Sequence, residues 1–274
     1  MVVGNSRRSF DRAIRLALFA LAILTAGFPG AGAIGVAHAQ SAPPAAPPAA
    51  PPAAAAPEAD AAKSQRALLA NLVLLRGRLI AGRELYQFAG NREAALRHLG
   101  PNLNSRMAGI EKGVGKDGAR KLQDAVNALN EVAKAGGDFA AFEKAYDAAV
   151  VASLRLHGAI TEGRLQQPRF VLAAIADVVD HAAEDYAAAV KDGKVVVIKE
   201  YEEVFGYNLA AVHQWQRVAA NHKIATTKGA AGVLEDMERL ARAVPSPVPL
   251  AALYLTPAEM TKLALHLKSQ VAVQ

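Results

Sequence analysis

Apolar residues recur every three to four positions through almost the whole of residues 62–271 of this 274-residue chain, and that spacing is the period of an α-helix. The expected helices, each burying one face, span residues 62–89, 91–99, 103–113, 117–135, 139–160, 165–190, 198–223, 227–243 and 257–271. Only residues 195–198, VVVI, have the composition of a strand, and they are too few to build a sheet. We therefore predict an all-α fold, an antiparallel helical bundle with short connections.

Several helix ends have local signals. Asp138 stands where its carboxylate can cap the helix that follows a Gly-Gly pair. Thr256 and Glu259, on either side of the first helical residue, have the spacing of a capping box. The proline-rich residues 244–249 cannot be helical and should form a connection over the bundle surface.

Residues 1–39 have the pattern of an export signal peptide, with a basic start, an apolar run at residues 16–27 and small residues before the expected cleavage point. The pair Arg7-Arg8, followed by Phe10, favours the twin-arginine route, and an arginine-rich secretory signal is the alternative. The apolar run is too short and too interrupted to be a membrane span. We expect a periplasmic protein with no stable membrane insertion after the signal is cleaved.

Residues 40–60 are rich in alanine and proline, and such a segment cannot bury a core. We expect it to be a disordered linker that acts as a spacer. The remaining residues 61–274 are enough for a single all-α helical domain.

Composition excludes several function classes. The chain has no cysteine, so disulfides, thiolate zinc sites and iron–sulfur clusters are excluded. The net charge is +6, of which four arginines and one aspartate in residues 1–39 supply +3. The rest of the chain therefore has no strong basic excess, and nucleic acid is not an expected partner.

The candidate site lies in residues 181–207, on both sides of an Asp-Gly turn. Carboxylates and histidines three or four residues apart on facing helices are how helical bundles hold metal ions. The candidate ligands are Glu184, Glu200 and Glu203, with Asp180 and His181 next. Oxygen and imidazole ligands without thiolate favour iron, manganese, zinc or calcium. His98 and His157 are isolated in the sequence and are expected to be structural.

The same hairpin resembles the extracytoplasmic helical region fused to some bacterial iron permeases of the high-affinity uptake type. The resemblance rests on acidic-Tyr pairs before and after a DGKVV-like turn; the matching residues are Glu184, Asp185, Tyr186, Asp192, Gly193, Lys194, Glu200, Tyr201 and Glu203. It implies an iron-related role, with an envelope iron-uptake component as the partner.

A looser resemblance covers residues 71–82 and 95–106, which are similar to a family of α-proteobacterial periplasmic helical proteins. Arg78 stands where that family's pattern has histidine, whereas His98 is retained. The further histidine and glutamate of the pattern are missing from the residues near His98.

The sequence therefore predicts a periplasmic helical protein that binds or helps deliver a metal ion, iron first, without catalysis. It has no GxSxG, HExxH or P-loop motif, and nothing in it indicates an enzyme. The main alternative is a metal-free interaction module of the cell envelope, in which the acids are solvated. A third possibility is a scaffold that binds a small molecule.

Overall fold

A computed structural model describes residues 55–88, 91–100, 103–220 and 230–273. Its elements are α2 (Ala55–Phe88), α3 (Arg92–Leu99), α4 (Leu103–Ala135), α5 (Phe139–Arg155), the short 3₁₀ helices η1 (Leu156–Ala159) and η2 (Arg164–Gln166), α6 (Pro168–Ala189), β1 (Val190–Lys191), β2 (Lys194–Val195), α7 (Ile198–Ala219), α9 (Ala230–Ala243) and α10 (Pro257–Val273). The predicted all-α fold is confirmed for this part of the chain.

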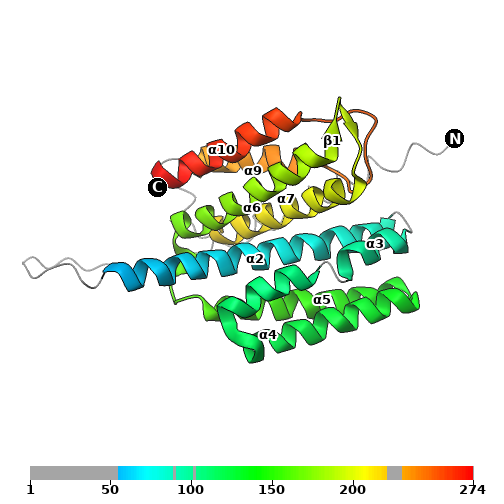
Figure 1. Cartoon of the computed structure of the whole chain (residues 1–274), viewed down its shortest axis with the longest axis horizontal. Helices are drawn as coiled ribbons and strands as arrows, with labels where there is room; N and C mark the ends of the chain where they lie inside the picture. Colours follow the sequence, from blue (N-terminus) through cyan, green and yellow to red (C-terminus); the bar gives the residue numbers. More distant parts are fainter. Residues whose placement is uncertain (1–54, 89–90, 101–102, 221–229, 274) are drawn as a thin grey trace, which may run out of the picture. The chain divides into compact units, whose positions relative to one another are not determined.

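Helix α2 runs through the middle of the helical domain (Figure 1), with α3, α4 and α5 on one side and α6, α7, α9 and α10 on the other. It packs against α7, α3, α4 and α6, and α6 and α7 pack against each other. Because α2 is shared by the two sides, one hydrophobic core runs through both. None of the described helices combines the length and the apolar composition that a membrane span requires.

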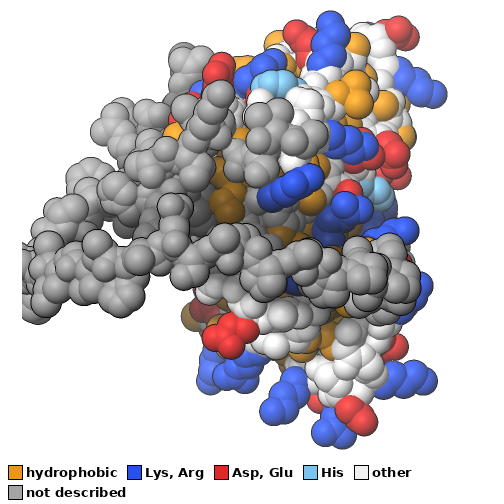
Figure 2. Space-filling model, turned by 90° about the vertical axis from the view of Figure 1, so that its left-hand side faces the viewer, with side chains coloured by type: hydrophobic (Ala, Val, Ile, Leu, Met, Phe, Trp, Pro, Cys, Tyr) orange, Lys and Arg blue, Asp and Glu red, His pale blue; other side chains and the backbone are white. Residues whose placement is uncertain are grey.

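The surface of the described residues has mixed charge. On the face drawn in Figure 2, lysine and arginine side chains are interspersed with aspartate and glutamate among apolar atoms.

The helix boundaries agree with the predicted ones at most ends. Helix α2 begins at Ala55, before the predicted start at residue 62, and so takes in the last residues of the segment predicted as a linker. Alanine is the strongest helix former, and Pro57 lies in the first turn, where proline is tolerated. The predicted export signal and the rest of the linker fall in residues 1–54, outside the described residues.

Two other boundaries depend on glycine. The predicted break between residues 113 and 117 is confirmed by a kink in α4 at Gly115, which has φ 75°. Helix α5 ends at Arg155, whereas it was predicted to continue to residue 160. The 3₁₀ helix η1, which contains Gly158, replaces the last α-helical turn, and glycine weakens an α-helix. The predicted end of the helix at residue 223 and the start at residue 227 lie outside the described residues.

The Asp-Gly turn joins α6 to α7. Asp192 and Gly193 have φ of 50° and 71°, the conformation of a two-residue hairpin turn with positive φ at both positions. Val190 pairs with Val195 in the hairpin. The strand character predicted for residues 195–198 is therefore wrong beyond Val195, because the ladder is two residues long and α7 begins at Ile198.

The predicted caps are confirmed. The Asp138 carboxylate accepts a hydrogen bond from the backbone N–H of Ala141 at 2.7 Å. Thr256 and Glu259 form the reciprocal bonds of a capping box, with 2.7 Å from the Thr256 N–H to Glu259 Oε2. Residues 244–249 are not helical.

The backbones of α2 and α7 come close together at Gly77 and Gly206. A Cβ atom at Gly206 would collide with the carbonyl oxygen of Gly77. A Cβ at Gly77 would lie 2.6 Å from Tyr207 Cδ1 and 2.9 Å from the Gly206 carbonyl carbon. Any side chain at either position would therefore force the two backbones apart.

We predict that Gly206→Ala destabilises the protein by about 3 kcal/mol, at the upper end for overpacking, because the colliding atom belongs to the backbone and cannot move alone. The matched control is Gly158→Ala, where an added Cβ meets nothing within 4 Å. The measurement is the urea midpoint of unfolding. Equal midpoints for the two variants would mean that the helices do not meet at this crossing.

Candidate functional site

Two consecutive glutamates in the second turn of α7 are buried. Glu202 is 3% exposed and Glu203 is 2% exposed. Helix α7 lies between α2 and α6, so its first turns are covered on more than one side. Since a buried carboxylate is costly unless it is paired, the partners of these residues define the site.

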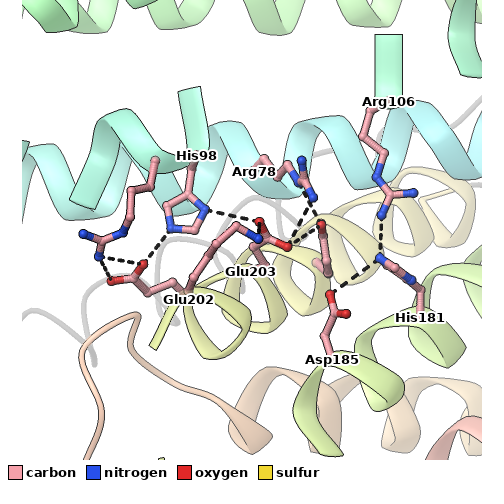
Figure 3. Close-up of polar contacts among 10 residues, drawn as sticks. Arg78, His98, Arg106, His181, Asp185, Glu202 and Glu203 are labelled. Atoms are coloured by element: carbon pink, nitrogen blue, oxygen red, sulfur yellow. Dashed lines mark hydrogen bonds and ion pairs between the residues drawn. The ribbon is translucent and has the colours of Figure 1, made fainter. Parts of the chain in front are cut away.

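Glu203 is held by cations from two helices (Figure 3). Arg78 of α2 lies 3.2 Å from Oε2, and Lys199, one turn earlier on α7, lies 2.9 Å from Oε1. The Tyr207 hydroxyl donates to Oε2 and accepts a bond from Arg78 Nε at 2.9 Å. Burial by itself would raise the pKa of Glu203, but Arg78 and Lys199 outweigh it and hold that pKa below its ordinary value. Glu203 is therefore an ionised carboxylate.

Glu202 is paired mainly with residues of α3. Its Oε2 lies 2.8 Å from His98 Nε2, and Arg97 Nη2 is 3.2 Å from Oε1. His98 is fully buried, and its Nδ1 lies 3.9 Å from Glu203 Oε1 without a hydrogen-bond partner. His98 thus stands between the two glutamates (Figure 3), so a histidine that is isolated in the sequence has acidic partners in the fold.

A second histidine approaches from α6. Arg106 Nη2 bonds His181 Nε2, and Asp185 Oδ2 lies 3.5 Å from the same nitrogen. Burial, with the charges of Arg106 and Arg78, lowers the pKa of His181, so its neutral ring accepts the bond from Arg106. Burial, with the charge of Glu203, raises the pKa of Asp185 to about 6.

We call this group the polar core; it consists of Arg78, Arg97, His98, Arg106, His181, Asp185, Lys199, Glu202, Glu203 and Tyr207. Its residues come from α2, α3, α4, α6 and α7. Its arginines and lysine offset its carboxylates, so the group is close to charge balance.

The five predicted ligands do not converge. Glu203 and His181 lie in the polar core. The Glu184 side chain is 76% exposed, and its Oε2 lies no closer than 4.0 Å to His181 Nδ1. Asp180 pairs with Lys268 of α10 at 2.7 Å on the surface. Glu200 is half-buried, and its Oε2 has no hydrogen-bond partner.

The described residues contain no three histidine, aspartate or glutamate side chains placed to hold a metal ion together. The residues that sequence reasoning missed are Glu202, Asp185 and Arg106 as members of the site, and His98 as the partner of Glu202. Their contacts join positions up to 105 residues apart, which no local spacing reveals. The looser resemblance had singled out Arg78 and His98, and both lie in the polar core.

The fold and the polar core define an all-α protein with a helical bundle around a buried ionic network. Residues 161–273 match the model of the iron permease-associated 4-helix bundle domain. This segment is under half of the chain, and it contains the helices α6, α7, α9 and α10. No curated protein and no solved structure matched the chain in the same comparisons.

The match supports the resemblance drawn from the hairpin, which lies inside it. It covers only part of the polar core. Glu202, Glu203, Asp185 and His181 lie within the matched segment, whereas Arg78 and His98 lie outside it. The network therefore links the bundle that resembles the iron permease-associated domain to the helices that precede it.

We predict that Arg78→Leu destabilises the protein by about 3–5 kcal/mol, because it removes one partner of a buried ion pair and leaves Glu203 undercompensated. Adding Glu203→Leu should recover most of the loss, since the uncompensated carboxylate is then gone.

The control for these two variants is Lys134→Ala. It breaks an exposed ion pair in which Lys134 Nζ lies 2.8 Å from Glu131 Oε1. It should cost less than about 1 kcal/mol. Urea unfolding of the three variants tests the prediction, and an Arg78→Leu loss no larger than that of the surface pair would contradict it.

Proposed function

We propose that the chain is a non-catalytic helical protein of the periplasm that binds a metal ion, iron first, in the polar core and hands it to an iron-uptake component of the envelope. Two observations support this. Residues 161–273 match the model of an iron permease-associated 4-helix bundle domain. The polar core also brings imidazole and carboxylate groups together, the ligand types that iron, manganese and zinc accept.

The arrangement of His98 carries the proposal. Its Nε2 shares a hydrogen bond with Glu202, and its Nδ1 faces Glu203 without a partner. Histidines that bind metals nearly always donate the other ring N–H to a carboxylate, which orients the ring. Two bonds of about 2.1 Å can bridge ligand atoms up to about 4 Å apart. The 3.9 Å between His98 Nδ1 and Glu203 Oε1 fits that span.

Lys199 is the cation that a metal ion would replace. Its ammonium lies 2.9 Å from Glu203 Oε1, and its side chain is 33% exposed, so it can turn toward solvent. Arg78 would keep its bond to the other oxygen of Glu203. Asp185 is a candidate for a further ligand, because the charge of Glu203 acts on it and its Oδ2 lacks a hydrogen-bond partner.

A second candidate function is the metal-free interaction module. It is favoured by the charge balance of the polar core, in which Arg78 and Lys199 pair with Glu203 and Arg97 pairs with Glu202. In that case the ionic network fixes how α2 and α3 pack on the bundle, and the protein acts through its surface on an envelope partner.

The first experiment measures metal binding by the domain from residue 55 onward, by calorimetry and thermal unfolding with Fe²⁺, Mn²⁺ and Zn²⁺ under anaerobic conditions. A metal that binds only the folded state raises its melting temperature. We expect Lys199→Met to tighten binding, since it removes the competing cation. His98→Gln should abolish binding, and Glu202→Gln should weaken it roughly 10–100-fold through loss of the orienting carboxylate.

Glu184→Gln is the control, because that exposed glutamate should leave binding unchanged. Saturable binding that changes in these opposite directions supports the metal site. If wild type and Lys199→Met both bind none of the three metals, the metal site is wrong and the metal-free alternative remains.

A further inference from the structure

A pocket of about 90 Å³ lies where α2, α5 and α7 meet. Its walls are Arg76 and Ile80 of α2, Tyr146 and Val150 of α5, and Ala210, His213 and Arg217 of α7. None of these residues belongs to the polar core. The volume holds several water molecules, and therefore a small polar ligand.

Arg76 is a buried cation without a carboxylate partner among the described residues. It is 8% exposed, its Nη2 donates to Gln214 Oε1 at 2.6 Å, and its Nε has no hydrogen-bond partner. Burial, together with the charge of Arg217, lowers the pKa of Arg76 to about 9. In the polar core, by contrast, Arg78 and Arg97 are paired with glutamates.

A second arginine stands beside Arg76 at the pocket. Arg217 lies on its wall. Burial, with the charges of Arg76 and Arg217, lowers the pKa of His157 to about 4, so that nearby ring is neutral. A buried charge is expensive unless it is paired and hydrogen-bonded, and Arg76 has no carboxylate partner among the described residues. The pocket therefore favours an anionic ligand.

We propose that this pocket is a binding site for a small oxyanion, a phosphate or a carboxylate group, anchored by the Arg76 guanidinium with Arg217 and His213 around it. Arginine donates from several N–H groups in a fixed plane, which suits both groups. The Tyr146 hydroxyl is a further donor on the wall, because burial raises its pKa to about 12 and keeps it protonated. The site stands apart from the polar core and does not depend on metal binding.

The test is calorimetry of the domain with sodium phosphate, sulfate or citrate, against chloride at the same ionic strength. Concentrations up to roughly 10 mM would saturate a site of millimolar Kd. Phosphate and sulfate report a tetrahedral oxyanion, and citrate reports a carboxylate ligand. We expect saturable binding of at least one of them at a single site.

Arg76→Gln should weaken that binding at least about tenfold, since it removes a charge-assisted hydrogen bond. Arg217→Gln should do the same, and it keeps the buried part of the pocket intact. Arg120→Gln, at an exposed position of α4, is the control and should bind like wild type. The proposal would be overturned if wild type bound none of these anions. It would also be overturned if Arg76→Gln and Arg217→Gln both bound as tightly as wild type.

Discussion

The close crossing of α2 and α7 at Gly77 and Gly206 is the constraint on which both sites depend. It brings the two backbones close together, so the side chains that flank Gly77 contact residues of α7. Arg76 and Arg78 are two positions apart on a helix, and residues at that spacing point to different faces. Arg78 therefore enters the polar core on one flank of α7, and Arg76 enters the pocket on the other.

Arg78 and Arg76 are both buried cations, but their partners differ. Arg78 has Glu203 and Tyr207 as partners within 3.2 Å, and the carboxylate in turn has Lys199. Arg76 has the neutral Gln214 as its hydrogen-bond partner, and the charge of Arg217 acts against it. Arg78 therefore has its counter-charge within the protein, whereas Arg76 has no carboxylate partner among the described residues. A metal in the polar core would exchange with a cation, whereas a ligand in the pocket would add a counter-charge.

The polar core also decides how the two parts of the domain are joined. The bundle of α6, α7, α9 and α10 lies within the segment that matches the iron permease-associated domain, and α2 to α5 precede it. The ionic contacts of His98, Arg97 and Arg78 with Glu202 and Glu203 cross this division. A function assigned to the matched segment alone would leave out His98, whose Nδ1 faces Glu203.

The sequence by itself determined the elements that depend on neighbouring residues. The helical periods, the cap at Asp138, the capping box at Thr256 and the turn at Asp192 all rest on contacts within about four residues, and each was predicted. Only the tertiary structure decided which acids are buried. Glu184 and Glu203 are both acids beside the same turn, yet one is on the surface and the other is enclosed by α2 and α7. That difference comes from helix packing between residues more than a hundred positions apart, which local sequence patterns cannot predict.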